Sequence, residues 1–325
     1  MKSIWMLKFT FLSIMLVISC DSGIEKQEDL QKTLSFLLKR LEIDKALSIN
    51  QFTIKKIDGR WSLVGKTNEK RVYNSLKFYA DSLSYFYSIK TLPDSALKDS
   101  IFGIVNVSVT PIRQEPKHSS QMVDQAILGN YVKLYEKEED WFLCQTEYDY
   151  VGWINKTAIQ KCDKKELYRW REKALHKVIS LSGTLYSKPN RSSLPITDVV
   201  LNNLIKKTGN SGQWGEFILP DGRKGYLHNK DYRTIKLNGK SNQAIILNIT
   251  KTTKKLIGTP YLWGGNSTKG SDCSGFTQLI FKSEGVFLPR DARQQALLGK
   301  FIETGQFSVG DLLFFGDGIK VTHVG

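Results

Sequence analysis

The sequence predicts an α+β protein in which two small β-barrels separate a helical N-terminal segment from a C-terminal domain of mixed helix and strand. Leucines recur at intervals of three and four between residues 30 and 41, which is the spacing of one face of a helix. A stretch that runs from residue 116 to residue 154 recurs at a constant offset of 73. Near the C-terminus, a helical pattern from Cys273 precedes an alternating, strand-like pattern.

The N-terminus has the features of a secretory signal. Two lysines precede the apolar run 9–18, which is too short and too close to the N-terminus for a permanent transmembrane helix. Residues 1–20 are therefore predicted to be a signal peptide. The stretch Val17-Ile18-Ser19-Cys20 resembles a bacterial lipobox, which predicts that Cys20 is lipidated. A plain secretory signal with an incidental cysteine is the alternative.

Either kind of signal takes the protein out of the cytosol. With a lipid anchor, we expect a cell-envelope protein that is periplasmic or associated with the outer membrane. The formal net charge of +15 is spread along the chain, and residues 239–325 carry only +4 of it. This distribution predicts no nucleic-acid partner and favours an anionic wall or membrane surface. We expect a monomer.

Residues 21–102 are predicted to be a helical segment, and the 325-residue length leads us to expect two or three domains in the whole chain. One amphipathic helix is marked by Leu30, Leu34, Leu37, Leu38 and Leu41. A second is indicated by Tyr79, Leu83, Phe86 and Tyr87.

The repeat predicts two copies of one small domain, because it is too long for a solenoid unit. The offset of 73 aligns Pro116 with Pro189, Leu128 with Leu201, Trp141 with Trp214, and Gly152-Trp153-Ile154 with Gly225-Tyr226-Leu227. Short alternating segments between Gly, Asn and Pro turns predict antiparallel barrels at 103–162 and 179–238, joined by a linker helix at 163–178. The tryptophan and the later Gly-aromatic-aliphatic triplet resemble the bacterial SH3 family. This resemblance implies wall or substrate recognition, with simple packing against the next domain as the alternative.

Three further cysteines are Cys144, Cys162 and Cys273. Because three is odd, at least one thiol is unpaired or pairs between chains in an oxidising compartment. Cys144 and Cys162 form a bridge or are two ordinary buried thiols, and the sequence leaves both readings open. No CxxC or HxxH motif occurs in the sequence, so no metal site is expected.

Cys273 stands at the start of a predicted helix. Ser271 or Asp272 is suited to cap this helix, and Gly285 is suited to end it. A thiol in the first turn lies near unpaired backbone N–H groups and the positive end of the helix dipole, which favour the thiolate. The small residues Ser274 and Gly275 are expected to leave room for a substrate, and the N–H groups there can stabilise an oxyanion. Cys273 is therefore the candidate nucleophile.

A thiolate nucleophile needs a base that later protonates the leaving amine, and histidine suits this role. Of the four histidines in the sequence, His118 and His228 fall in predicted barrel turns and His176 closes the predicted linker helix. These three are expected to be surface residues. His323 lies in an alternating strand pattern and can face a helix packed across the sheet. It is the candidate base.

Residues 256–325 resemble the NlpC/P60 family of papain-like cysteine peptidases, which cut bacterial wall peptides. Five blocks carry the resemblance in the family's order and spacing: 258–265 (GTPYLWGG), 272–276 (DCSGF), 288–292 (LPRDA) with Gln295, 310–315 (GDLLFF) and 323–325 (HVG). The resemblance implies a papain-like peptidase domain over residues 239–325, Cys273 and His323 as the catalytic pair, and no cofactor.

The order of the predicted domains is similar to that of the γ-D-glutamyl-L-diamino acid endopeptidases. This similarity implies cleavage between D-Glu and the diamino acid of peptidoglycan-derived peptides of the type L-Ala-γ-D-Glu-diaminopimelate. In that group the first barrel closes one end of the cleft, so that only a free N-terminal L-alanine fits. Glu115 and Tyr150 stand where the group keeps an acid and a tyrosine near the substrate amine.

Further substrate-binding residues follow from the chemistry of a buried ammonium, which needs carboxylates to offset its desolvation. Candidates are the acids Glu115, Asp272 and Asp291, the walls Tyr150 and Tyr261, and the hydroxyl of Ser274. The alternatives are solvated acids for Glu115 and Asp291, core packing for Tyr261 and a helix cap for Ser274.

The family usually has a further polar residue beyond the motif that contains His323, and this residue orients the imidazole. The sequence ends at Gly325, so we expect the domain at 239–325 to be incomplete at its C-terminus and its activity to be impaired. The alternative function is a non-catalytic lipoprotein that binds wall peptides, with the peptidase domain as a lid. Retention of Cys273, Asp272 and His323 argues against this alternative, and the barrels disfavour acyl transfer to lipid.

Overall fold

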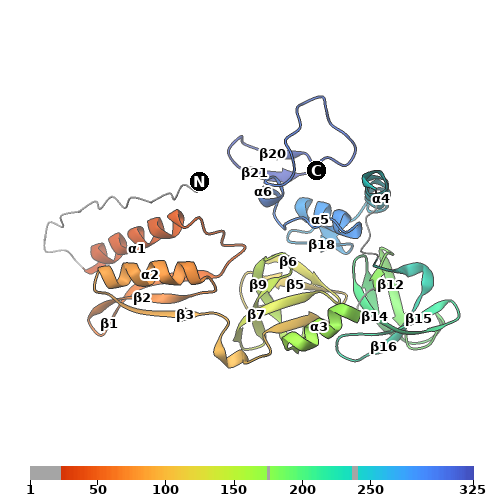
Figure 1. Cartoon of the computed structure of the whole chain (residues 1–325), viewed down its shortest axis with the longest axis horizontal. Helices are drawn as coiled ribbons and strands as arrows, with labels where there is room; N and C mark the ends of the chain where they lie inside the picture. The colour runs from red at the N-terminus through yellow and green to blue at the C-terminus, as the bar shows by residue number, and fades with distance from the viewer. Residues whose placement is uncertain (1–22, 174–175, 236–240) are drawn as a thin grey trace, which may run out of the picture.

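The computed structural model describes residues 23–173, 176–235 and 241–325. The predicted signal peptide and Cys20 lie outside the described residues. The described chain forms four units: an N-terminal unit, two barrels side by side, and a C-terminal unit that lies across both barrels (Figure 1). No helix in the described ranges has the length and apolar character needed to cross a membrane.

The N-terminal unit is a three-stranded sheet with both of its helices on one face (Figure 1). Its elements are α1 (Gly23–Arg40), β1 (Asn50–Ile57), β2 (Arg60–Thr67), α2 (Lys70–Ser82) and β3 (Phe86–Thr91), with strand order β1-β2-β3. The predicted leucine-rich helix is confirmed, since Leu34 of α1 is fully buried with Ile54 and Leu63.

The prediction of a purely helical segment at 21–102 is wrong. Asp58-Gly59 forms the two-residue turn of a hairpin between β1 and β2, and both residues have the positive φ, 48° and 76°, that such a turn requires. The second predicted helix ends at Ser82, and Phe86 and Tyr87 belong to β3. Over so few residues, the alternating pattern of a strand and the three-to-four spacing of a helix cannot be told apart. Pairing with β2 makes residues 86–91 a strand.

The two barrels repeat one strand order, which confirms the duplicated fold. The first contains β4 (Phe102–Val105), β5 (Val109–Arg113), β6 (Met122–Ile127), β7 (Tyr131–Glu138), β8 (Trp141–Thr146), β9 (Val151–Asn155) and β10 (Ile159–Cys162), ordered β10-β4-β7-β8-β9-β5-β6. The second contains β11 (His176–Val178), β12 (Ser182–Tyr186), β13 (Pro195–Val200), β14 (Leu204–Ser211), β15 (Trp214–Ile218), β16 (Lys224–His228) and β17 (Tyr232–Thr234), ordered β13-β12-β16-β15-β14-β11-β17. Reading the first order backwards places each strand opposite its counterpart 73 residues later.

The helix between the barrels, α3 (Lys164–Lys173), is shorter than the linker helix predicted at 163–178. Residues His176–Val178 form β11 instead, because the second barrel needs a strand where the first has β4. His176 is therefore not a surface residue at a helix end. Its ring packs 6.0 Å from that of Phe217 and 5.7 Å from that of Tyr232, centroid to centroid.

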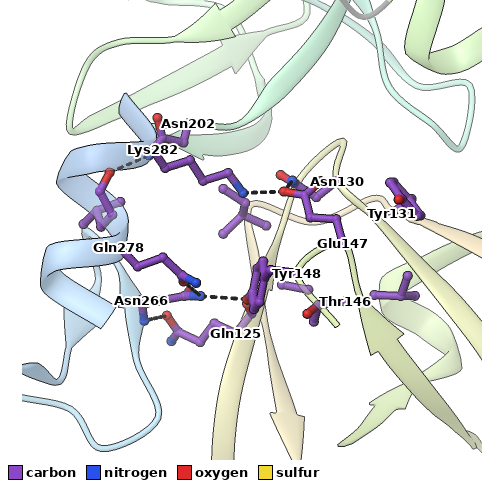
Figure 2. A pocket seen from close by; sticks show the side chains of 14 residues that line it. Gln125, Asn130, Tyr131, Thr146, Glu147, Tyr148, Asn202, Asn266, Gln278 and Lys282 are labelled. Atoms are coloured by element: carbon purple, nitrogen blue, oxygen red, sulfur yellow. Dashed lines mark hydrogen bonds and ion pairs between the residues drawn. The ribbon is translucent and has the colours of Figure 1, made fainter. Parts of the chain in front are cut away.

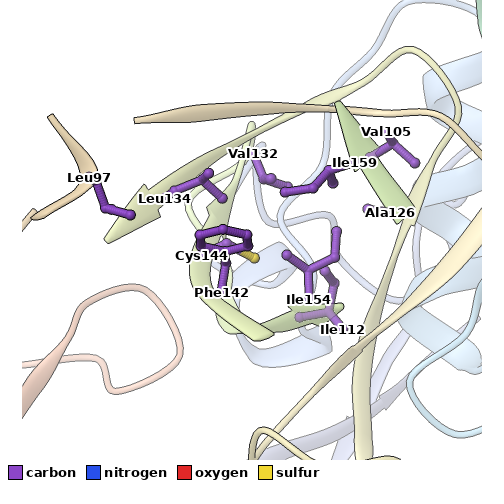
Figure 3. Packing of buried hydrophobic residues seen from close by; sticks show 10 residues of the cluster. All are labelled: Leu97, Val105, Ile112, Ala126, Val132, Leu134, Phe142, Cys144, Ile154 and Ile159. Carbon is purple, nitrogen blue, oxygen red and sulfur yellow. The ribbon is translucent and has the colours of Figure 1, made fainter. Parts of the chain in front are cut away.

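The first barrel's core settles the question of the two cysteines. Cys144 is fully buried among apolar side chains that include Leu134, Phe142 and Ile154 (Figure 3). Cys162 is buried in a different cluster beside Trp170, and both thiols are free. Burial raises the pKa of both, with neighbouring carboxylates adding to the effect, and takes that of Cys162 to about 12. Both are ordinary protonated thiols.

Each barrel docks on the next unit through the same turn. Leu128, in the turn between β6 and β7, is fully buried in the core of the second barrel. Leu201, its counterpart between β13 and β14, is buried in the core of the C-terminal unit. Gly129 follows Leu128 with a φ of 81°, and a Cβ there would lie 2.1 Å from the Leu204 carbonyl oxygen. The turn therefore needs glycine because the second barrel's backbone approaches it so closely.

The C-terminal unit is built around one buried helix, α5 (Cys273–Ser283), and its other elements are α4 (Asn242–Lys255), β18 (Asn266–Ser267), β19 (Gly270–Ser271), α6 (Ala292–Gln295), β20 (Phe314–Gly316) and β21 (Val321–Val324). Leu279 and Ile280 of α5 pack against Ile249 of α4 and Leu256, which follows it. The strand β21 contacts both α5 and α6. Segments far apart in the sequence thus meet at the start of α5.

Candidate active site

The start of α5 is fixed by Asp272, whose Oδ1 accepts a hydrogen bond from the Gly275 N–H at 2.8 Å. Asp272 rather than Ser271 is therefore the helix cap. A Cβ at Gly275 would lie 1.9 Å from the Gly265 carbonyl oxygen. The glycine thus makes room for the chain's own backbone, and the expectation that it leaves space for a substrate is corrected.

Cys273 follows this cap, is partly exposed and is a free thiol. It opens into a cleft of about 270 Å³. The cleft is lined by Gln121, Val123 and Tyr150 from the first barrel, by Tyr261, Trp263, Gly264, Asp272, Cys273 and Ser274 around the start of α5, by 290–293, and by Val321 and Thr322 from β21. Two domains therefore form the walls around the candidate nucleophile.

Six of the predicted site residues lie together in this cleft: Tyr150, Tyr261, Asp272, Cys273, Ser274 and Asp291. Glu115 is not one of the lining residues. Its side chain is 55% exposed and pairs with Lys117 at 2.5 Å. The structure thus places Glu115 as a surface acid, and its role at the substrate amine stays a prediction.

His323 lies on β21 directly after two residues that line the cleft, Val321 and Thr322. Its exposed ring packs 5.9 Å, centroid to centroid, from the ring of Phe315 on β20. Within the described residues no hydrogen bond joins this imidazole to Cys273. The pairing of Cys273 with His323 therefore stays a prediction. The strand that carries His323 lies beside the cleft.

The carboxylate of Asp272 is held by groups of the protein itself. Besides the cap, it accepts a hydrogen bond from the Gly264 N–H at 2.9 Å and pairs with Arg290 at 2.6 Å and 3.0 Å. Ser274 is equally enclosed, since its hydroxyl accepts from Arg290 at 3.1 Å. The roles of Asp272 and Ser274 in binding substrate stay predictions, and both side chains already position the helix start.

Arg290 extends this network into the first barrel. The guanidinium is 2% exposed, and its Nε donates to Asp124 Oδ1 at 2.8 Å. The hydroxyl of Tyr148 donates to the other oxygen of Asp124 at 2.6 Å. Burial raises the pKa of Asp124 to about 6, against the opposing charge of Arg290. The Asp124–Arg290–Asp272 network thus ties the barrel to the residue that caps the cysteine helix.

The sequence alone does not indicate this function of Asp124 and Arg290. In the sequence, Arg290 is one position of the LPRDA block. The available signal was a charged residue at the end of the apolar run 286–289, since an arginine in such a place is seldom buried without a partner. Its partner could not be read from the sequence, because Asp124 is 166 positions away.

Two tyrosines line the cleft, and they differ in how far they are exposed to solvent. Tyr150 is 9% exposed, and burial, followed by the charge of Asp291, raises its pKa. Tyr261 is 62% exposed, and burial of its hydroxyl end, followed by Cys273, raises its pKa. The exposure of Tyr261 excludes the alternative that it merely packs in the core. Both hydroxyls remain protonated donors in the cleft that holds Cys273.

A second contact between the first barrel and α5 surrounds a cavity of about 20 Å³, room for about one water molecule (Figure 2). Lys282 of α5 pairs with Glu147 of the barrel at 2.6 Å. The Asn266 amide donates to the Tyr148 hydroxyl at 3.0 Å, and the Asn266 N–H donates to Gln125 Oε1 at 3.0 Å. These polar contacts hold the barrel and α5 in one orientation, so the first barrel and the cysteine helix form one structural unit.

Comparison with known proteins identifies both parts of this unit. Residues 258–325 match the NlpC/P60 family, and residues 112–159 match the bacterial dipeptidyl-peptidase SH3 domain. The chain is 30% identical over 220 residues to dipeptidyl-peptidase 6 of Lysinibacillus sphaericus, covering 66% of this chain and 81% of that protein. It is 27% identical over 206 residues to the gamma-D-glutamyl-L-lysine dipeptidyl-peptidase of Bacillus cereus, covering 61% of each chain.

One solved structure supports the fold. The crystal structure of an NlpC/P60 family protein from Bacillus cereus superposes with a TM-score of 0.59 at 22% identity, covering 69% of this chain and 86% of that chain. With the cleft, the capped cysteine helix and the barrel beside it, these matches show that the chain belongs to the NlpC/P60 family of papain-like fold, with SH3-like barrels ahead of the family domain.

Proposed function

We propose that the protein is a cysteine peptidase that hydrolyses peptides of peptidoglycan. One observation carries the proposal: a free, partly exposed cysteine begins a buried helix inside a cleft of about 270 Å³. The N-terminus of a helix stabilises negative charge on a thiolate and on an oxyanion. The relatives named dipeptidyl-peptidases support the same chemistry.

For the bond that is cut, we propose the link between γ-D-Glu and the diamino acid in a stem peptide with a free N-terminal L-alanine. A relative named for γ-D-glutamyl-L-lysine supports this choice. The first barrel supplies Gln121, Val123 and Tyr150 to one wall of the cleft, and such a wall can exclude a longer N-terminal extension. Asp291 lies in the same cleft and supplies a carboxylate for the substrate ammonium.

In the proposed reaction, Cys273 Sγ attacks the γ-glutamyl carbonyl carbon, and a C–S bond forms. The C–N bond then breaks as the imidazolium of His323 gives its proton to the leaving amine. Water, deprotonated by the same imidazole, attacks the thioester and restores the thiol. Backbone N–H groups in the first turn of α5 stabilise the oxyanion of both steps.

The test is incubation with L-Ala-γ-D-Glu-L-Lys and with its diaminopimelate counterpart, followed by mass spectrometry. We expect release of the L-Ala-D-Glu dipeptide and no release from peptides with an acetylated N-terminus. The matched control is Cys273→Ala. Turnover that survives this substitution, or equal cleavage of the acetylated peptide, contradicts the proposal.

We also propose that Cys20 is lipidated, that the lipid anchors the protein in the cell envelope, and that the protein acts as a monomer. The lipobox-like stretch before Cys20 supports the anchor. Labelling with a radioactive fatty acid is expected for the wild type and not for Cys20→Ser. Equal labelling of both would refute the anchor, and light scattering of the mature protein tests the monomer.

A further inference from the structure

We propose that Asp44, in the loop between α1 and β1 of the N-terminal unit, is a positioning residue of the substrate-amine site, where it limits Arg293 to a single hydrogen bond with Asp291. This inference rests on the proposed function, because it assigns to Asp291 the binding of the substrate ammonium. It gives the N-terminal unit a part in choosing the substrate.

The geometry favours Asp44 over Asp291 as the partner of Arg293. Nη1 and Nη2 of Arg293 each lie 2.8 Å from a different oxygen of Asp44, which is the two-pronged arrangement that arginine and carboxylate prefer. Gln294 adds a third donor to Asp44 at 3.0 Å. Arg293 reaches Asp291 through one nitrogen only, at 3.1 Å. The Tyr150 hydroxyl also donates to Asp291. Because a carboxylate can accept about four hydrogen bonds, the Asp291 carboxylate keeps capacity for another cation.

The loop that contains Asp44 contacts both the first barrel and the residues that follow Asp291. Its own carboxylate accepts a hydrogen bond from the Ala46 N–H at 2.9 Å. The carbonyl oxygen of Ala46 accepts from the N–H of Val151 at 2.7 Å, directly after Tyr150. The Gln145 side chain donates to the Leu47 carbonyl oxygen at 2.8 Å. One loop therefore touches strand β9, which begins directly after Tyr150, and the helix that Asp291 caps.

Charge explains why this contact affects binding. Burial alone would raise the pKa of Asp44, but hydrogen bonds from Arg293 and Gln294 hold it below its usual range, so the group is anionic at neutral pH. Without that anion, Arg293 is free to form its two-pronged pair with Asp291. A substrate ammonium would then compete with a guanidinium tethered two residues away. Arg293 is 45% exposed, so we expect a moderate effect.

The experiment measures binding by calorimetry on the Cys273→Ala background, so that turnover plays no part. The two probes are L-Ala-γ-D-Glu-L-Lys and its propionyl analogue, which lacks only the amino group. Asp44→Asn is expected to weaken binding of the first probe roughly threefold to tenfold and to leave the second within about twofold, since one charged contact is worth about that much. Arg293→Gln added to Asp44→Asn is expected to restore the affinity.

If Arg293→Gln restores the affinity that Asp44→Asn lowers, Asp44 does not have a purely structural role. Arg293→Gln would not repair an N-terminal unit that Asp44→Asn had loosened. The matched control is Asp94→Asn, which removes another paired acid of the same part of the chain, bound to Lys90 at 2.5 Å, and is expected to change neither affinity. Arg293→Gln alone is expected to bind the amine probe as well as the parent or better.

The outcomes distinguish two failures. If Asp291→Asn does not weaken binding of the amine probe relative to that of the propionyl probe, the proposed amine site is wrong. This inference is then wrong as well. If Asp291→Asn weakens the amine probe but Asp44→Asn does not, or Arg293→Gln fails to restore affinity, only the role of Asp44 is overturned.

Discussion

At the scale of single residues, three thiols of the described chain have different environments. Cys144 and Cys162 lie in apolar clusters, where burial raises the pKa of both. Cys273 is partly exposed at the start of a helix capped by Asp272. Of the three, only Cys273 has both access to solvent and backbone N–H groups that favour an anion.

We therefore expect iodoacetamide to label Cys273 at least about tenfold faster than the two buried thiols in the native protein, because the thiolate is the species that reacts. Peptide mapping by mass spectrometry measures the three rates. Labelling should equalise in denaturant, which serves as the control. Native labelling of Cys144 at the rate of Cys273 would contradict this assignment.

Gly275 offers a second prediction at this scale. Gly275→Ala places a Cβ 1.9 Å from the Gly265 carbonyl oxygen, so α5 or the strand beside it must move. We expect the free energy of unfolding to fall by about 1–3 kcal/mol or more, measured by urea denaturation. Gly209→Ala is the matched control, because its nearest neighbour is the flexible end of Glu216 at 3.0 Å. Equal losses in the two variants would refute the argument from close approach.

At the scale of elements, the Asp124–Arg290–Asp272 network joins strand β6 to the first turn of α5. Replacing a buried partner leaves uncompensated charge in a medium that solvates it poorly. The barrel therefore helps to position Cys273 indirectly, because Asp124 holds Arg290 and Arg290 holds the helix cap Asp272.

Arg290→Met is expected to lower the free energy of unfolding by about 3–5 kcal/mol, because two carboxylates lose their shared partner. The exposed pair of Arg71 with Glu69 provides the control, and Arg71→Gln should cost less than about 1 kcal/mol. Guanidinium denaturation compares the two. Adding Asp124→Asn to Arg290→Met should recover part of the loss, and a simple sum of the two losses would argue against a coupled network.

At the scale of the whole molecule, the barrels and the C-terminal unit are linked by two copies of one docking turn. Leu128 enters the second barrel, and Leu201 enters the C-terminal unit beside Leu279. Asn202 adds a hydrogen bond to the Leu279 carbonyl oxygen at 2.9 Å. The duplication therefore repeated a means of attachment together with the fold.

Leu201→Ala is expected to loosen the C-terminal unit from the second barrel, at a cost of about 2–5 kcal/mol for a buried leucine. Hydrogen exchange should rise in α4 and α5 and stay unchanged in the core of the first barrel. Leu128→Ala is the matched variant, and its increase should appear in the second barrel instead. The same exchange pattern for both variants would contradict separate docking.

The parts of the fold that the sequence predicted correctly depend on short-range order. The leucine spacing predicted α1, the offset of 73 predicted the duplicated barrels, and Asp272 predicted the start of α5. The strands of the N-terminal unit and the strand at His176 were missed, because each is decided by pairing with a distant segment. Local pattern favours a helix or a strand only weakly over so few residues.

The sequence by itself determined the family and the cysteine at a capped helix start, because these depend on neighbours along the chain and on the chemistry of single residues. Only the tertiary structure decided that Asp124 pairs with Arg290, 166 positions away, and that Asp44 pairs with Arg293 across 249 positions. Charged residues pair with whichever partner the folded chain brings within about 3 Å, and no local pattern records that partner.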